Sequence, residues 1–296
     1  MKKKLLITGA SGFLGYHLLK AASKDREVYG IYHSRSLNSR SAITIHCDIT
    51  DYISLGNYFD DIEPDAVIHA AAKADANFCQ QNKEQSYLVN VEATKNIAGI
   101  CSDYHIPLAF TSTDLVFDGT KGMYREDDVK NPVSAYGEQK SIAEDEVLRI
   151  YPDTTVFRLP LMFGYPEASA TNYMQQFIGQ MRNGETLHLF HDEYRSVCGA
   201  GSISEGILTL FEKTSGIIHL AGKERLSRLD FGNMVVKAFE IATEKIHACS
   251  QKDVKMSVAR PADVSLDISK AILLGYNPLK VEEELGLIAQ SSMLGS

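Results

Sequence analysis

Residues 4–15 read KLLITGASGFLG, a short apolar run followed by glycines at positions 9, 12 and 15. The run predicts a β-strand over Lys4–Thr8, and the stretch after the glycines predicts a helix over Phe13–Ser23. A glycine turn between strand and helix lets a pyrophosphate approach the free N–H groups that open the helix. The spacing G-x-x-G-x-x-G differs from the commoner G-x-G-x-x-G, and a glycine spacing alone is weak evidence. The predicted strand before it and the predicted helix after it favour a dinucleotide site over a turn without a ligand.

Strand and helix signals alternate through the first half of the chain. Further strands are expected at Val28–Tyr32, Ile43–Cys47, Ala66–Ala70, Leu108–Thr111, Thr154–Arg158 and Ile217–Leu220. Helices are expected at about Glu84–Tyr104, Ser134–Ile150, Tyr173–Asn183, Ser202–Lys213 and Arg228–Thr243. Strands separated by helices form parallel βαβ units. The predicted fold class is therefore α/β, a Rossmann-type doubly wound parallel sheet with a smaller C-terminal substrate-binding region.

The alternation of predicted strands and helices is regular in the first half of the chain and irregular after it, which suggests two parts. Residues 1–163 are predicted to form the nucleotide-binding domain, and residues 164–296 the substrate-binding region, with a strand near 217–221 rejoining the first sheet. About 20 residues between Asp114 and Ser134 carry turn residues and no periodic pattern. A loop of this length inside a domain is usually functional or mobile.

Composition limits the partners of the protein. The 296 residues carry 38 acidic and 30 basic side chains, a formal net charge of -8. Neither nucleic acid nor an anionic membrane is expected as a partner of such a chain. The five cysteines form no C-x-x-C pair, and no apolar run is long enough to span a membrane, so a reduced, cytoplasmic protein is expected.

Several histidines, acidic residues and cysteines could in principle bind a metal or act as nucleophiles, but each is predicted to have a structural role. His188 and His191 lack a clear third ligand, and the acidic run Glu126–Asp128 fits a solvated turn, so no metal site is predicted. His69 lies in an apolar strand and is expected to be a hydrogen-bonded core histidine. Cys79 and Cys198 show no paired histidine and are expected to be structural thiols.

The end of the second predicted strand bears on the choice of cofactor. NAD sites usually place an acidic residue there to hold the ribose 2′-hydroxyl. This strand is followed by His33, Ser34 and Arg35, which suit a 2′-phosphate better. NADP(H) is therefore the preferred cofactor and NAD(H) the alternative, while Arg35 as an ordinary surface residue stays open.

Tyr136 and Lys140 stand four residues apart, on one face of the predicted helix. A free tyrosine titrates near pH ~10, and a neighbouring ammonium lowers that value by stabilising the phenolate. Such a tyrosine can protonate a carbonyl oxygen as hydride arrives at its carbon. Thr113 lies 23 positions earlier, at the end of a predicted strand, where its hydroxyl could hold the same carbonyl.

In their order and spacing, the glycine loop, Thr113, Tyr136 and Lys140 resemble the extended short-chain dehydrogenase/reductases. Within that group, the segments STDLVFDG at 112–119 and PVSAYG at 132–137 look like the dTDP-4-dehydrorhamnose reductase branch. The segments VIHAAA at 67–72, VNV at 89–91 and RPADVSLD at 260–267 are similar to the same branch. The resemblance spans essentially the whole chain, and it is strong to about Arg158 and patchy beyond.

The resemblance implies a role for each matching residue. Thr113 would bind the substrate carbonyl, Tyr136 would donate the proton, and Lys140 would hold the nicotinamide ribose while tuning Tyr136. Cofactor contacts would come from Gly9, Gly12, Phe13, Leu14, Gly15, Asp48, Ile49, Ala70, Ala71 and Ala72. Asp114 would face the sugar, and Arg195 and Arg260 would contact a substrate diphosphate, with ordinary surface salt bridges as the alternative.

The chain departs from the branch at several positions. The Trp that the branch often has just after the arginine that matches Arg158 is missing, and Leu161, Met162 and Phe163 stand there. Its acidic pair after the alanine run is replaced by Asn77 and Gln80. These changes bear on the identity of the sugar. Related 4,6-dehydratases carry Asp-Glu after the threonine, whereas this chain has Asp114-Leu115, so a dehydratase is not expected.

The sequence thus predicts an NAD(P)H-dependent reductase of a 4-keto sugar nucleotide. A sugar-nucleotide epimerase on the same scaffold is one alternative. A non-catalytic regulatory subunit of the methionine adenosyltransferase type is another, and it would be favoured by a broken catalytic set. The expected partner is a sugar nucleotide, and a homodimer is left open.

Overall fold

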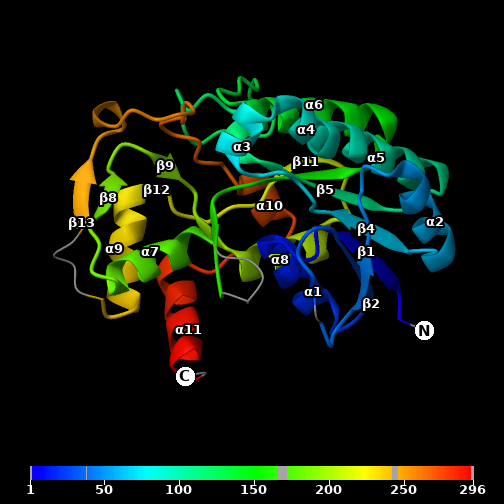
Figure 1. Ribbon diagram of the computed structural model, residues 1–296, viewed down its shortest axis with the longest axis horizontal. Helices are drawn as coiled ribbons and strands as arrows, with labels where there is room; N and C mark the ends of the chain where they lie inside the picture. Colours follow the sequence, from blue (N-terminus) through cyan, green and yellow to red (C-terminus); the bar gives the residue numbers. More distant parts are fainter. Residues whose placement is uncertain (1, 38, 166–171, 242–245, 295–296) are drawn as a thin grey trace.

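The computed structural model describes residues 2–37, 39–165, 172–241 and 246–294. Within these residues, seven parallel strands form the central sheet in the order β11-β6-β5-β4-β1-β2-β3 (Figure 1). Their bounds are β1 (Lys4–Thr8), β2 (Glu27–Tyr32), β3 (Ile43–His46), β4 (Ala66–His69), β5 (Leu108–Thr113), β6 (Thr155–Leu159) and β11 (Gly216–His219). The predicted α/β class and Rossmann-type sheet are confirmed.

Helices cover both faces of the sheet because its strands are apolar on both sides. On one face, α1 (Phe13–Ala22) and α8 (Ala200–Leu210) pack on side chains such as Leu5 and Ile7. On the other face, α2 (Tyr52–Ile62), α5 (Ala93–Asp103) and α6 (Ala135–Ile150) pack on Leu6 and Val67. Successive residues of β1 therefore enter opposite cores.

The second half of the chain forms a smaller layer beside the sheet, on the left in Figure 1. It holds α7 (Tyr173–Arg182), α9 (Arg228–Ala238) and α11 (Val281–Leu294), which enclose a separate apolar core. Its short strands pair as β7 (Met162–Phe163) with β10 (Cys198–Gly199), β8 (Leu187–Phe190) with β13 (Ile246–Cys249), and β9 (Tyr194–Arg195) with β12 (Leu226–Ser227). The short helix α10 (Ser269–Leu273) lies against β11.

Several elements differ from the sequence prediction. The helix expected over Glu84–Tyr104 is broken into α4 (Lys83–Tyr87), a π-helical turn (Leu88–Glu92) and α5. Four helices of the described residues were not predicted, namely α2, α10, α11 and the short α3 (Ala76–Gln81). Helix α2 opens with Asp51, whose side chain accepts a hydrogen bond from the Ser54 N–H. The end of the helix expected over Arg228–Thr243 lies partly outside the described residues.

The segment between Asp114 and Ser134 is anchored to the core. After a 3₁₀ turn at Asp114–Val116, the ring of Tyr124 stacks on Phe117 at 4.1 Å, and the Tyr124 N–H donates to the Ser265 carbonyl. The Glu126 carboxylate accepts a hydrogen bond of 3.1 Å from the His219 N–H. The interpretation of Glu126–Asp128 as a solvated turn is therefore wrong for Glu126, because this carboxylate binds the backbone of edge strand β11.

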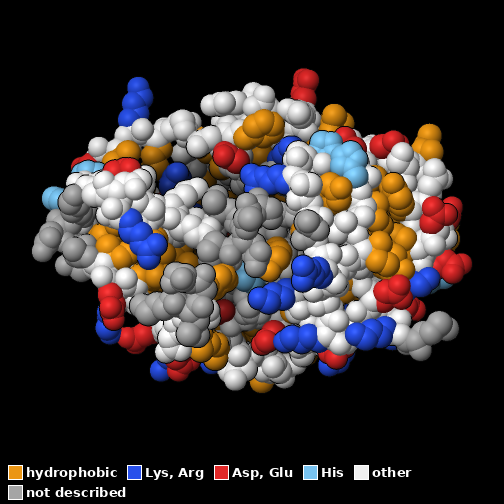
Figure 2. Space-filling model, turned by 60° about the horizontal axis from the view of Figure 1, so that its bottom comes forward, with side chains coloured by type: hydrophobic (Ala, Val, Ile, Leu, Met, Phe, Trp, Pro, Cys, Tyr) orange, Lys and Arg blue, Asp and Glu red, His pale blue; other side chains and the backbone are white. Residues whose placement is uncertain are grey.

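Three further features concern membrane spans, surface charge and the cysteines. No helix of the described residues has the length and apolar character that crossing a bilayer requires. On the face shown in Figure 2, lysine and arginine side chains lie interspersed with acidic ones. All five cysteines fall within the described residues and are free thiols, and Cys79 and Cys198 are buried.

Candidate active site

Two adjoining cavities, of about 620 and 640 Å³, open at the carboxyl ends of the central strands. Gly9, Gly12, Ala70, Ala72 and Asp75 line both, so the cavities form one continuous cleft. The carboxyl edge of an open parallel sheet is where ligands bind in α/β proteins of this kind. The first cavity carries the predicted catalytic residues, and the second carries the residues assigned to the adenine end of a cofactor.

The glycine loop after β1 and the first turn of α1 are too tightly packed for side chains at two glycines, one in each. Gly9 has φ of +70°, and a Cβ there would meet the Ala71 Cα at 2.6 Å. A Cβ at Gly15 would meet the Gly9 carbonyl oxygen at 2.1 Å. The loop thus brings bare backbone to the cleft. Phe13 and Leu14 follow it along the first cavity, and Gly12 caps α1 without a side-chain hydrogen bond. These residues fit a bound pyrophosphate.

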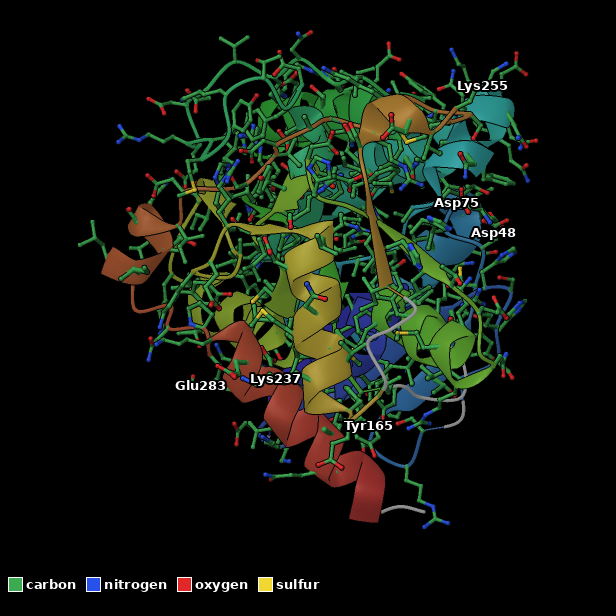
Figure 3. The ribbon with its side chains drawn as sticks, turned by 90° about the vertical axis from the view of Figure 1, so that its left-hand side faces the viewer. Asp48, Asp75, Tyr165, Lys237, Lys255 and Glu283 are labelled. Carbon is green, nitrogen blue, oxygen red and sulfur yellow. The ribbon has the colours of Figure 1, made fainter. Side chains whose placement is uncertain are left out.

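The second cavity collects the residues assigned to the adenosine end. It is lined by His33, Ser34, Arg35, Asp48, Ile49, Ala70, Ala71 and Ala72. The His33 Nε2 lies 3.6 Å from the Asp48 Oδ2, and the His33 ring stacks on His46. In Figure 3, Asp48, Asp75 and Lys255 lie along the same side of the molecule. The cavity therefore combines the basic groups of His33 and Arg35 with the carboxylates of Asp48 and Asp75.

The first cavity brings Thr113, Tyr136 and Lys140 together. Thr113 ends β5, and its hydroxyl accepts from the Leu115 N–H and donates to Asp114. Ser134 caps α6 through the Gly137 N–H and so places Tyr136 in the first turn, one turn before Lys140. The Lys140 ammonium lies 3.9 Å from the centroid of the Phe110 ring. All three predicted catalytic side chains lie in one buried corner, exposed by less than a tenth.

Burial shapes the protonation of this corner. It raises the pKa of Tyr136, so the phenol stays protonated at neutral pH in the protein by itself. It lowers the pKa of Lys140 to about 7, against the opposing effect of the Glu144 carboxylate. A protonated tyrosine beside a lysine that titrates near neutrality can give a proton to a carbonyl oxygen.

Buried polar side chains beneath the cleft are hydrogen-bonded to one another. The His69 ring sits between the hydroxyls of Thr8 at 2.7 Å and Thr94 at 2.9 Å. It is the hydrogen-bonded core histidine that the sequence predicted. Asn90, in the π-helical turn, accepts from the Lys73 N–H and donates to the Gln139 side chain, both at 2.8 Å.

The substrate end of the first cavity is built on ion pairs. The Arg195 Nη1 donates to the Asp114 carboxylate at 3.0 Å, and the Arg195 Nη2 lies 3.5 Å from Glu193. Arg195 thus forms salt bridges, as the alternative expected, but as a buried side chain and not on the surface. Its contact with a substrate diphosphate stays a prediction. Arg260 is exposed on the segment Val258–Pro261, which also lines the cavity.

Sequence reasoning missed other lining residues. Arg228 is buried, lies 3.8 Å from Glu193 and sits 3.4 Å above the Tyr173 ring. A basic residue at the start of a helix carries no sequence signal for such a place. Leu161 and Met162 also line the cavity. Asn77 accepts a hydrogen bond from Ser257, and Gln80 accepts one from the Ala135 N–H.

Within the described residues, no three His, Cys, Asp or Glu side chains cluster so as to hold a metal ion. His188 lies on β8 beside His247 of β13, with ring centroids 5.7 Å apart. The cleft is lined by hydroxyl, phenol, ammonium and guanidinium groups together with the backbone of the glycine loop.

Known proteins share this sequence pattern and geometry. The model of the RmlD substrate binding domain matches residues 3–292. The chain belongs to this family. A Haloferax volcanii relative named "Probable low-salt glycan biosynthesis reductase Agl14" is 30% identical over 288 residues, covering 95% of this chain and 96% of the relative. A methionine adenosyltransferase 2 subunit beta from Danio rerio is 24% identical, covering 93% and 86%.

A solved structure gives the same fold. The crystal structure of dTDP-4-dehydrorhamnose reductase from Bacillus anthracis, in complex with NADP, matches with a TM-score of 0.87 at 20% identity. The match covers 98% of this chain and 100% of that one. The resemblance to the extended short-chain dehydrogenase/reductases is therefore confirmed, and with it the class of oxidoreductase.

Proposed function

We propose that the protein reduces a 4-keto sugar nucleotide with a nicotinamide cofactor, NADP(H) in preference to NAD(H). The observation that carries the proposal is the convergence of Thr113, Tyr136 and Lys140 beside the glycine loop in one cleft. The name of the Haloferax relative, a reductase of glycan biosynthesis, supports the class of reaction. The Bacillus structure with NADP supports the cofactor.

The residues divide the work of the reaction. A reduced nicotinamide, when bound, supplies the hydride. Thr113 donates a hydrogen bond to the substrate carbonyl, and Tyr136 gives its phenolic proton to the same oxygen. Lys140 binds the nicotinamide ribose, and its charge stabilises the phenolate left on Tyr136. The apolar walls Leu161 and Met162 exclude water from this corner.

Cofactor and substrate contacts follow from the lining residues. Gly9, Gly12 and the start of α1 hold the cofactor pyrophosphate, and His33, Ser34 and Arg35 hold a 2′-phosphate. Arg260 and Arg228 face the substrate diphosphate. Arg195 orients Asp114 toward the sugar, because both of its terminal nitrogens lie beside carboxylates.

The test is oxidation of NADPH and of NADH, followed by absorbance, with dTDP-4-dehydrorhamnose as substrate. Tyr136→Phe is expected to lose about 10²- to 10⁴-fold in kcat while binding the cofactor as before. The matched control is Tyr151→Phe, at the other end of α6 and outside both cavities. Equal activity in Tyr136→Phe would exclude the assigned proton donor. Cofactor that copurifies with the protein, without net oxidation, would favour an epimerase.

The second candidate is a non-catalytic subunit. The beta-subunit relative covers most of this chain and favours it. The intact set of Thr113, Tyr136 and Lys140 in a lined cavity weighs for catalysis. Recovery of a methionine adenosyltransferase in a pull-down, with no reductase activity, would decide for the subunit. The five free thiols accord with the cytoplasmic location that we propose.

A further inference from the structure

A fully buried ion pair lies behind the catalytic corner, between Glu144 on α6 and Arg158 on β6. The Arg158 Nε and Nη2 donate to the carboxylate at 3.0 and 2.9 Å, and the two side chains are 0% and 1% exposed. The Ser112 hydroxyl donates to the same carboxylate at 2.5 Å. Buried charges cost free energy unless they are paired and hydrogen-bonded, so these partners fix the carboxylate in one position.

The pair joins the elements that carry the reaction. Glu144 follows Lys140 by one helical turn and Tyr136 by two, on the same face of α6. Ser112 is the residue before Thr113 on β5. Arg158 precedes the segment Leu159–Met162 that lines the first cavity. The ion pair therefore lies behind the catalytic corner, joined to the strand of Thr113 through the Ser112 hydroxyl, and it does not line the cleft itself.

We propose that Glu144, fixed by Arg158 and Ser112, is a positioning residue that keeps the Lys140 ammonium charged through its own buried negative charge. This role rests on the proposed function, because Lys140 matters only if it serves Tyr136. Glu144 lines neither cavity, so it acts through Lys140 and not by contact with a ligand.

The charges around Lys140 support this direction of effect. On β4, His69 is neutral, since burial and the Lys140 charge lower its pKa to about 3. Cys79 on α3 and Asp114 beside Thr113 act on Tyr136. Glu144 is the group that favours the protonated amine against the burial of Lys140. Lys130 lies 3.4 Å from the same carboxylate but points from the surface side, at 17% exposure.

The test measures the titration of Lys140 directly. Trace acetic anhydride labels Lys140 in the cofactor-free protein at a series of pH values, and mass spectrometry gives the midpoint. Glu144→Gln is expected to lower the midpoint by about 1 pH unit. From a pKa of about 7, that shift lowers the charged fraction at pH 7 about fivefold, and kcat with it. Glu144→Asp, which keeps the charge, is expected to restore the midpoint.

Two further variants serve as controls for the effect of Glu144 on the titration of Lys140. Glu144→Gln leaves Arg158 buried and unpaired, so the double variant Glu144→Leu/Arg158→Met tests the same charge in a repacked core, where such replacements are often neutral. Glu146→Gln, on the exposed side of the same helix, is the matched control and is expected to leave the midpoint unchanged. An unchanged midpoint in the folded single and double variants overturns the proposal. A lowered midpoint in a protein that reduces no keto sugar retains the effect of Glu144 on Lys140 and refutes the proposed function instead.

Discussion

The Arg195 guanidinium lies 3.0 Å from the Asp114 carboxylate, and both side chains are more than nine-tenths buried. Arg195 belongs to β9 in the C-terminal layer, whereas Asp114 follows Thr113, the last residue of β5 in the central sheet. The ion pair therefore joins the two layers at the first cavity, which both residues line. Burial raises the pKa of Asp114, and the charge of Arg195 opposes that rise.

Arg195→Met is expected to lower the free energy of unfolding by about 3–5 kcal/mol, because it leaves a buried carboxylate without its partner. Urea unfolding followed by circular dichroism measures the loss. The double variant Arg195→Met/Asp114→Asn removes the uncompensated charge and is expected to recover at least half of that loss. An equal loss in the single and double variants would show that Arg195 stabilises by packing and not by pairing.

The cofactor phosphate gives a second prediction. Arg35→Ser is expected to raise the KM for NADPH about tenfold, because an exposed charge-assisted contact contributes about 1.4 kcal/mol. The KM for NADH should hardly change, since NADH has no 2′-phosphate. Arg40→Ser is the matched control, because Arg40 lies outside both cavities of the cleft. Parallel changes for both cofactors would argue against a 2′-phosphate contact.

The parts of the structure that the sequence predicts are those encoded locally. An apolar run, a glycine turn and an amphipathic helix lie within about 20 residues, so all seven central strands could be placed from the sequence. Tyr136 and Lys140 share one helix, and Thr113 ends the neighbouring strand. Their convergence follows from the parallel sheet, in which the carboxyl ends of the strands share an edge.

The remainder depends on contacts between distant residues. Strand β8 pairs with β13, with His188 opposite His247. The two strands are far apart in the sequence, and the residue pattern of neither strand indicates which strand it pairs with. Arg228 opens α9 and reads as a surface residue until Glu193 and Tyr173 surround it. The helix expected over Glu84–Tyr104 is interrupted at Asn90, whose side chain binds the Lys73 backbone and Gln139 instead of solvent. Only tertiary structure provides these partners.

The proposed role of Lys140 predicts the pH dependence of the proposed reaction. Its pKa of about 7 means that the ammonium is present below neutrality and is lost as the pH rises through that value. The kcat/KM is therefore expected to fall on the alkaline side with a midpoint near pH 7. Lys140→Arg keeps its charge at every accessible pH, so its residual activity should show no such fall. A fall at the same pH in Lys140→Arg would assign the titration to another group.

The last prediction concerns α11, which is anchored to the core by Glu284. This buried carboxylate accepts hydrogen bonds from the Gly199 and Ser202 N–H groups and from the Ser202 hydroxyl, at the start of α8. Nearer the surface, Lys237 of α9 pairs with Glu282 of α11, and Figure 3 shows Lys237 beside Glu283 there. A carboxylate at the N-terminus of α8 is favoured by the free N–H groups and the helix dipole.

A methyl group at position 199 would occupy the place of that carboxylate, since a Cβ there lies 1.8 Å from the Glu284 Cδ. Gly199→Ala is therefore expected to lower the free energy of unfolding by about 1–3 kcal/mol, because Glu284 must leave three donors. Gly286→Ala is the matched control on α11, where a Cβ meets nothing within 4 Å. It should raise stability by about 0.5–1 kcal/mol through helix propensity. Thermal and urea unfolding of both variants measure the difference. Equal effects of the two substitutions would mean that the contact between Glu284 and α8 contributes nothing to the anchoring of the C-terminal helix.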